Sequence, residues 1–436
     1  MPLPVRVPFR QAFALGLALL AGCGGGKDVP TTTTEPAPLV SLQFATPKLP
    51  VLSIRTDGAA PIASREVYLT GAVTLADTAG ATLLSSALEI RGRGNSTWGL
   101  MPKKSYRLKL GTSASLLGMP ANRHWVLLAN YSDKTLLRND LTFALSRMMG
   151  MPWTPRSAFV DVSVNGEYLG VYQLVEHVRI GTERVNIDGM KAADTSATAI
   201  TGGYLIEVDE RRGEAFCFNS TITAMVFCLN DPETLLEPGR EKQRAYITGY
   251  VAQADTALFG RRFEDPDVGY AKYIDVASAI DYNIIQEVVK NVDGDLRFST
   301  FLYKPRGGKL TFGPVWDFDL AIGNVNYYGA DSPEGWHSRN GAWFTRMFQD
   351  PAFKARFVAR WGALESAGTI DSLQRLVYAR ASYLKVVQER NFARWPILNT
   401  WVWPNRVVMG TYDDEILAMH VWLRDRVRWM DANITH

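Results

Sequence analysis

The chain has 436 residues, of which 47% are hydrophobic and 21% are charged, a balance that excludes a chain disordered throughout. Its 47 lysines and arginines almost balance its 44 aspartates and glutamates, so the formal net charge of +3 gives no indication of a nucleic-acid partner. The length is compatible with two to three domains or with one large elaborated domain.

Residues 1–22 have the pattern of a signal peptide. Arg6 and Arg10 precede a short apolar segment, residues 12–20, which is too short to span a bilayer. The sequence Leu-Ala-Gly-Cys that follows resembles a bacterial lipobox, which predicts lipidation of Cys23 and anchoring in the cell envelope, at the outer membrane or the periplasmic face. An ordinary secretory signal with a chance cysteine is the alternative. Residues 23–47 lack an apolar period and are predicted to form a flexible tether.

Residues 48–210 are predicted to be rich in β-strands, with one helix. Apolar and β-branched runs indicate strands at 49–56, 66–75, 105–110 and 203–208. Two further strands, 158–164 and 167–175, flank Asn165-Gly166, which is typical of a hairpin with a type I′ turn. The helix is expected from residue 133 to residue 149, capped by Ser132 or Asp133.

A glycine-bearing basic loop follows the strand that ends near Ile90. The loop reads RGRGNSTWG, and its glycines at 92 and 94 allow close approach of a phosphate group. Lys103 and Lys104 stand just before the next strand. This combination predicts anion binding, and a surface hairpin with solvated basic residues is the alternative.

Cys217 and Cys228 lie in two short runs of strand-forming residues. In an envelope protein the reducing cytosol is absent, so a disulfide across a hairpin is expected. The alternative is a pair of buried thiols.

Residues 211–432 are predicted to be mostly helical. Helices are expected at 275–290, from Asp350-Pro351 onward, at 372–392 and at 412–430. Between the first two lies an acidic hairpin, residues 291–324.

The acidic hairpin contains four aspartates around two predicted strands: Asp293, Asp295, Asp317 and Asp319. The strands are 300–304 and 310–316, joined by the turn sequence PRGG. A hairpin brings the two acidic pairs together, and carboxylates that face one cleft repel unless a hard cation such as Mg²⁺ lies between them. Helix caps or turn residues are the alternative role for these acids.

The order of these parts is similar to the order in protein kinases, from glycine-rich loop through strand lysine to catalytic and metal-binding aspartates. More specifically, the chain resembles the CotH family, the spore-coat-H type of atypical kinase, over roughly residues 48–430. Seven segments carry the resemblance: RGRGNSTW (91–98), PKKSYRLKL (102–110), SDKTLLRNDL (132–141), VNGEYLGVYQLVE (164–176), GGYLIEVD (202–209), NVDGDLRFSTFLYK (291–304) and GPVWDFDLAIGN (313–324).

The resemblance implies an α+β, atypical protein-kinase-like fold with two lobes over residues 48–432. The N-terminal lobe, 48–210, would be mostly β-sheet, and the C-terminal lobe, 211–432, mostly helical. It also implies an envelope-anchored kinase that transfers the γ-phosphoryl group of ATP to a protein hydroxyl with Mg²⁺ or Mn²⁺. The alternative is a non-enzymatic surface lipoprotein that uses the fold for envelope or coat assembly or for adhesion. The expected partners are a nucleotide, an envelope protein and the membrane, whereas the oligomeric state is left open.

Matching the family motifs residue by residue gives Asp293 as the catalytic aspartate. Some family members have an asparagine five residues later. Here that position is Phe298 and the nearest polar residue is Ser299, so Asp295 also stays a candidate for the catalytic acid. The resemblance implies further site residues: Asp317, Asp319 and Ser299 for the metal, Lys104 or Lys103 for the phosphates, Arg91 and Arg93 beside the phosphate loop, and Leu174–Val178, with Glu176, against adenine.

Overall fold

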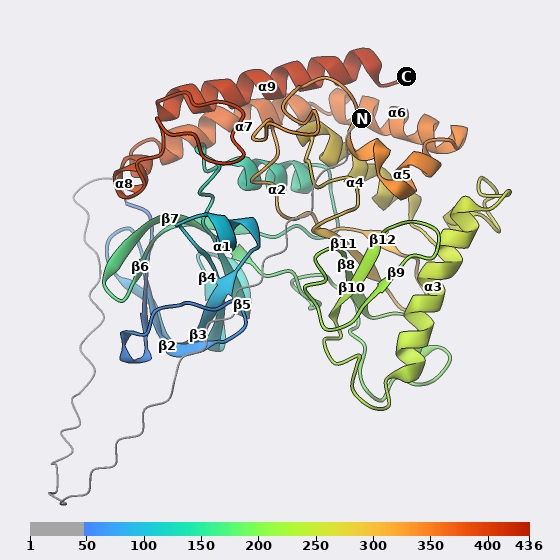
Figure 1. Ribbon diagram of the computed structural model, residues 1–436, viewed down its shortest axis with the longest axis horizontal. Helices are drawn as coiled ribbons and strands as arrows, with labels where there is room; N and C mark the ends of the chain where they lie inside the picture. Colours follow the sequence, from blue (N-terminus) through green and yellow to red (C-terminus); the bar gives the residue numbers. More distant parts are fainter. Residues whose placement is uncertain (1–47) are drawn as a thin grey trace, which may run out of the picture. The chain divides into compact units, whose positions relative to one another are not determined.

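The structure is a computed structural model that describes residues 48–436. The expected signal peptide, Cys23 and the tether to residue 47 lie outside the described residues. The first part of the described chain is a closed barrel with strand order β1-β2-β3-β4-β5-β7-β6 (Figure 1). Its strands are β1 (Val51–Thr56), β2 (Leu69–Ala76), β3 (Thr82–Arg93), β4 (Ser105–Leu116), β5 (Met119–Leu128), β6 (Ser157–Val164) and β7 (Glu167–Glu176).

Successive side chains along each strand point alternately to the inside and the outside of the barrel. Ile90 and Leu108 are partners across β3 and β4 and are buried among the apolar side chains of the barrel core. The next pair along the strands, Arg91 and Arg107, therefore faces outward. Parallel pairing of β1 with β6 closes the barrel. The β-rich N-terminal part was predicted, but a closed seven-stranded barrel is not a typical kinase lobe, so the two-lobed kinase expectation is only partly met.

The predicted hairpin between β6 and β7 is confirmed. Asn165 and Gly166 both have positive φ, 52° and 85°, as a type I′ turn requires. The predicted helix 133–149 is shorter than expected, because α2 spans Arg138–Met148. The Asp133 carboxylate accepts hydrogen bonds from the backbone N–H groups of Thr135 and Arg138, so it stabilises the turn before the helix.

A second sheet of five strands has the order β12-β11-β8-β10-β9. Its strands are β8 (Tyr204–Val208), β9 (Cys217–Asn219), β10 (Val226–Asp231), β11 (Thr300–Lys304) and β12 (Thr311–Phe312). The predicted acidic hairpin is present as β11 and β12, but β12 is much shorter than the predicted strand 310–316. Pro314 has no N–H to donate, so strand pairing stops before it. Cys217 and Cys228 face each other across β9 and β10 and form the expected disulfide, with an S–S distance of 2.05 Å.

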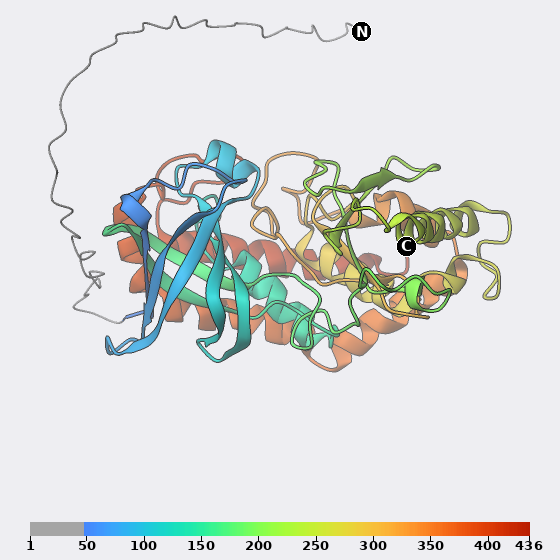
Figure 2. The same cartoon turned by 90° about the horizontal axis from the view of Figure 1, so that it is seen from below.

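The helices are α1 (Ser96–Leu100), α2, α3 (Glu241–Phe259), α4 (Val276–Val289), α5 (Ala342–Met347), α6 (Pro351–Ser366), α7 (Thr369–Leu384), α8 (Val387–Arg394) and α9 (Tyr412–Asn433). The helix predicted at 372–392 is thus two helices, α7 and α8, and α3 was not predicted. The barrel lies to one side of α2 and the second sheet to the other in both views (Figures 1 and 2). None of the helices in residues 48–436 is long and apolar enough to cross a membrane.

Helix α8 is fastened to strand β7 of the barrel. The Asn391 side-chain oxygen accepts hydrogen bonds from the Val171 backbone N–H at 3.1 Å and from Lys103 Nζ at 2.9 Å. Trp395 Nε1 donates to the Leu169 carbonyl at 2.8 Å. Lys103 is 1% exposed, so this contact buries its ammonium group between the barrel and the helix.

Candidate active site

A cavity of about 510 Å³ lies between the outer face of the barrel and the second sheet. The barrel contributes residues 91–97, 107 and 177–179 to its wall, and the sheet contributes residues from β8 and β10. Residues 293, 299, 301, 316, 317, 319 and 320 of the acidic hairpin also line it. Its volume falls within the range of small-molecule sites in proteins.

One end of the cavity is acidic. Ser299 Oγ donates a hydrogen bond to Asp317 Oδ2 at 3.2 Å. Arg211 forms ion pairs with Asp293 Oδ2 at 3.4 Å and with Asp209 Oδ2 at 3.2 Å, and its Nη1 lies 3.4 Å from Ser299 Oγ. The hairpin therefore brings Asp293 and Asp317 to one cluster, as the sequence predicted.

Several acids of the cavity hold their protons more strongly than usual. Burial raises the pKa of Asp293 to about 7, and the negative charge of Asp317 adds to the rise. Burial and the Asp317 charge likewise raise the pKa of Asp319 to about 8. Glu207 on β8 also has a pKa of about 8, because it is buried and close to Asp209. Perturbed acids that share a cavity are characteristic of functional sites.

Asp317 and Asp319 fit a divalent cation. Within residues 48–436 neither carboxylate has an ion-pair partner, and the Asp317 charge opposes ionisation of Asp319. No group of three or more His, Cys, Asp or Glu side chains in that range is arranged to hold a metal ion. Mg²⁺ bound through one or two carboxylates takes its other oxygen ligands from substrate phosphates and water, so two acids suffice.

The backbone at Asp317 is unusual. Its φ is 67°, in the left-handed region that few residues other than glycine adopt. The flanking Trp316 and Phe318 are 5% and 0% exposed, and their burial fixes the carboxylate between them. Such conformations persist only where the surrounding structure enforces them, and they cluster at functional sites.

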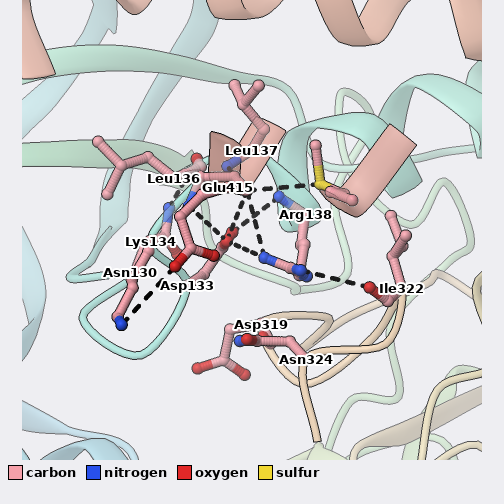
Figure 3. Close-up of polar contacts among 12 residues, drawn as sticks. Asn130, Asp133, Lys134, Leu136, Leu137, Arg138, Asp319, Ile322, Asn324 and Glu415 are labelled. Atoms are coloured by element: carbon pink, nitrogen blue, oxygen red, sulfur yellow. Dashed lines mark hydrogen bonds and ion pairs between the residues drawn. The ribbon is translucent and has the colours of Figure 1, made fainter. Parts of the chain in front are cut away.

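A buried ion pair holds the chain just after the acids (Figure 3). Arg138 donates to the carbonyls of Ala321 at 2.8 Å and Ile322 at 3.3 Å. Asp133 accepts from Arg138 Nη1 at 2.5 Å and is itself fully buried. Asp133 is also one of the charges that raise the pKa of Asp319, so it acts on that acid through space.

Two asparagines add to this support. The Asn139 side-chain oxygen accepts a hydrogen bond from the Phe318 backbone N–H at 2.8 Å. Asn324 Nδ2 donates to the Asp319 carbonyl at 2.7 Å and to the Ser132 carbonyl at 3.2 Å. The segment Ser132–Asn139, which the resemblance singled out, thus positions the acidic segment.

Arg93 lines the same cavity as the acids. Its guanidinium lies over the Trp316 ring at 5.3 Å, and it has no hydrogen bond or ion pair with any part of the chain that the structure describes. Burial lowers its pKa, whereas the charges of Asp317 and Glu207 act in the opposite sense. The cavity wall contains seven arginines and no lysine within the described range.

The structure does not place the two predicted lysines in the cavity, which corrects the expectation that one of them binds phosphate there. Lys103 Nζ donates instead to the Asn391 side-chain oxygen, and Lys104 Nζ donates to the Trp98 carbonyl at 2.5 Å. Both lysines precede β4, and neither lines the cavity. Arg91 and Arg93, by contrast, do line the cavity.

Glu176 and Asp295 are also absent from the cavity wall. Glu176 is fully buried and forms ion pairs with Arg156, at 3.0 Å, and with Arg184, so it stabilises the loop after β7. Its neighbours His177 and Val178 do line the cavity. Of the two candidate catalytic acids, Asp293 faces the cavity and Asp295 does not.

Three further charged residues of the cavity, Glu207, Asp209 and Arg211, were not among the predicted site residues. They come from the sequence YLIEVDER, where β8 ends. The signal was an acid within a buried strand and a second one directly after it. Such charges are rarely placed there without a partner or a ligand.

An α+β chain whose paired acids and arginines converge in one cavity is kinase-like in its charged groups. A family model described as CotH kinase protein matches residues 90–430 of the chain. The chain therefore belongs to the CotH kinase family. No curated protein matches it.

Proposed function

We propose that this chain is a Mg²⁺- or Mn²⁺-dependent kinase that transfers the γ-phosphoryl group of ATP to a protein hydroxyl. The observation that supports this most is that Asp293, Asp317 and Asp319 share one cavity with the guanidinium of Arg93, which is unpaired within residues 48–436. In this proposal the barrel acts as the nucleotide-covering lobe, and the helical part acts as the lobe that carries the acids.

A divalent cation bound here supplies neutralisation of charge on the phosphate oxygens. Asp317 and Asp319 are the residues that would hold it. The Ser299 hydroxyl orients Asp317 by donating to Oδ2, and the backbone bonds to Phe318 and to the Asp319 carbonyl fix both acids. In this way the chain holds the two carboxylates in place before any ligand arrives.

Asp293 is the proposed general base. A pKa of about 7 leaves a large fraction of its carboxylate ionised at neutral pH yet still basic enough to accept a proton. In the transfer step the acceptor oxygen bonds to the γ-phosphorus and its proton passes to Asp293. The bond from that phosphorus to the bridging oxygen breaks, and ADP leaves with the electron pair.

The arginines are proposed to stabilise the negative charge that develops on the transferred group. Arg93 is free to do so, and Arg211 is held beside Asp293. A guanidinium keeps its charge when buried and can bind two phosphate oxygens at once. This assigns to arginine the role that the family resemblance suggested for Lys103 or Lys104.

We further propose that the mature chain begins at a lipidated Cys23 and that its substrate is a protein of the envelope. The support is the sequence pattern of residues 1–23 alone. Replacing Cys23 by serine should move the chain from the membrane fraction to the soluble fraction. An unchanged distribution would contradict the lipobox.

The deciding experiment compares wild type with Asp317→Asn for transfer of labelled phosphate from ATP to envelope proteins. Wild type should label acceptors only with Mg²⁺ or Mn²⁺, and the variant should not label them while it keeps its circular dichroism spectrum. Binding of Mg²⁺–ATP by wild type without any transfer would favour the alternative, a ligand-binding surface lipoprotein. Equal transfer by the variant would refute the proposed site.

A further inference from the structure

The outer face of β3 and β4 has an unbalanced charge pattern beside the cavity. Glu89 and Lys109 are cross-strand partners, and they form an ion pair at 2.9 Å. The next outward-facing pair is Arg91 opposite Arg107. Like charges directly opposite each other destabilise a sheet, so this second pair calls for a compensating negative charge.

The two arginines are poorly satisfied by the protein itself. Arg107 lines the cavity and has neither a hydrogen bond nor an ion pair anywhere in residues 48–436, and its Nε is buried without a partner. Arg91 donates to the Arg65 carbonyl and lies 3.9 Å from the exposed carboxylate of Glu66, but its Nε is also buried without a partner. Leaving a buried donor unsatisfied is unfavourable, and more so for a charged group.

Two acids at this end of the cavity act on Arg107 by charge without pairing with it: Glu233 opposes the lowering of the Arg107 pKa by burial, and Arg107 opposes the rise of the Glu214 pKa. Glu233 forms its ion pair with Arg179 at 3.2 Å, and Glu214 accepts a hydrogen bond from Asn230 at 2.9 Å. Neither forms an ion pair with Arg107 within the described range. Within the described residues, both guanidinium groups at the cavity wall therefore keep N–H donors that have no hydrogen-bond acceptor.

We propose that Arg91 and Arg107 form a phosphate-binding subsite, separate from the acidic end of the cavity. Two facing guanidinium groups present several N–H donors to one tetrahedral oxyanion. Arg93 lies two residues further along the same face of β3, about 7 Å away at the rise of a strand. A group bound by Arg91 and Arg107 is thus distinct from a group bound by Arg93 beside Asp317.

The ligand is a phosphate group, either of a bound nucleotide or of free phosphate or pyrophosphate. This inference goes beyond the proposed function, because it needs neither a divalent cation nor phosphoryl transfer. A bound oxyanion reduces the repulsion between the two guanidinium groups further than the neighbouring acids do. Occupancy is therefore expected to stabilise the fold.

The test is calorimetric titration of the full chain, in EDTA, with pyrophosphate and separately with ADP. Arg107→Gln should weaken binding at least tenfold. Lys109→Gln removes one positive charge from the same face of the same strand, and it should leave affinity within twofold of wild type. Arg107→Lys keeps the positive charge but loses the planar guanidinium group. Its affinity should therefore lie between those of wild type and Arg107→Gln.

Stability measurements guard against a folding defect. Without ligand, Arg107→Gln should melt at or above the wild-type temperature, since it removes a like-charge contact. Lys109→Gln should melt slightly lower, because it breaks the pair with Glu89. A clear loss of stability in Arg107→Gln would overturn the proposal, since it would assign that residue a structural role.

The two ligands separate the sources of phosphate. Loss of pyrophosphate binding alone identifies a subsite for free phosphate, and loss of ADP binding identifies a nucleotide phosphate. The proposal is overturned if wild type binds neither ligand, if Arg107→Gln binds both as wild type does, or if Lys109→Gln loses as much affinity. Asp317→Asn should keep metal-free binding, so this subsite and the proposed transfer can fail independently.

Discussion

Ser299 Oγ donates to Asp317 Oδ2 over 3.2 Å, and this bond joins the chain that leaves helix α4 to the chain that follows β12. Ser299 has a φ of 48° and Asp317 a φ of 67°, so both residues of the contact have left-handed backbone. The family resemblance suggested Ser299 as a metal ligand. The geometry instead supports a role in orienting the Asp317 carboxylate.

Ser299→Ala is therefore expected to weaken the dependence on Mg²⁺ without abolishing transfer. The lost hydrogen bond corresponds to about 1 kcal/mol, or roughly a fivefold increase in the Mg²⁺ concentration for half-maximal rate. Titration of the rate with Mg²⁺ at saturating ATP measures this. Complete loss of activity would restore Ser299 to the set of metal ligands.

Asp293→Asn and Asp317→Asn should fail in different ways. Asp293→Asn removes the base and should lower kcat by about 10²–10⁴, with the Kd for Mg²⁺–ATP changed by only a few-fold. Asp317→Asn should abolish both tight Mg²⁺–ATP binding and turnover. Asp295→Asn is the matched control, because its side chain does not line the cavity. A loss in Asp295→Asn as large as in Asp293→Asn would contradict this assignment.

The rate should rise with pH as Asp293 ionises. Because the pKa of Asp293 is raised to about 7, kcat/KM is expected to increase between pH 6 and pH 8 and then level off. The residual kcat/KM of Asp293→Asn should not increase between pH 6 and pH 8. A wild-type profile that is flat over the same interval would exclude Asp293 as the base.

Asp319 makes stability depend on pH in the opposite direction. Its pKa is raised from 3.8 to about 8, so the folded state keeps a proton that the unfolded state has lost between these values. Stability therefore falls as pH rises from about 4 to 8. Asp319→Asn should raise the melting temperature relative to wild type at pH 8.5 in EDTA, and much less at pH 5.

The charge-matched control for that measurement is Asp267→Asn, since Asp267 is exposed. Its melting temperature at each pH gives the reference for removing one exposed carboxylate. Added Mg²⁺ should stabilise wild type at pH 8.5 more than it stabilises Asp319→Asn. A melting difference that stays constant across pH would show that Asp319 does not carry the raised pKa.

Removing the Cys217–Cys228 disulfide should destabilise the second sheet. The bond closes a short loop across β9 and β10, and the chain-entropy model gives a contribution of roughly 2–3 kcal/mol. Urea unfolding of the Cys217→Ser/Cys228→Ser double variant measures it. Reductant should lower wild-type stability by a similar amount and leave the variant unchanged. Two free thiols in non-reduced, unfolded wild type would show that the bond is absent.

Much of the fold was accessible from local sequence signals. The Asn165-Gly166 hairpin, the cysteine pair and the acidic hairpin followed from turn chemistry and strand patterns within short windows. Closure of the barrel depends on β1 pairing with β6, over a hundred residues apart, and no local pattern encodes such a pairing. The split between α7 and α8 was missed because the apolar period continues across it.

The site was predictable where the acids lie close in sequence, and not where it depends on tertiary contacts. Asp293 and Asp317 were found because one hairpin joins them. The predicted position of the lysines in the cavity was wrong. The direction of a side chain just before a strand depends on a partner that is distant in sequence, which for Lys103 is Asn391. Arg211 was missed because nothing near it in the sequence shows that it meets Asp293.

The attachment of α8 to β7 has a mechanical consequence. Gly170 has no room for a side chain, because a Cβ there would lie 2.7 Å from the Asn391 side-chain oxygen, so barrel and helix are in direct contact. Close packing of this kind holds α8 rigidly against β7, at a contact whose residues do not line the cavity. The rim formed by residues 94–97 does line the cavity, so in the proposed function nucleotide access is expected there. Hydrogen exchange should be fast in that rim and slow at Val171, whether or not ligand is present.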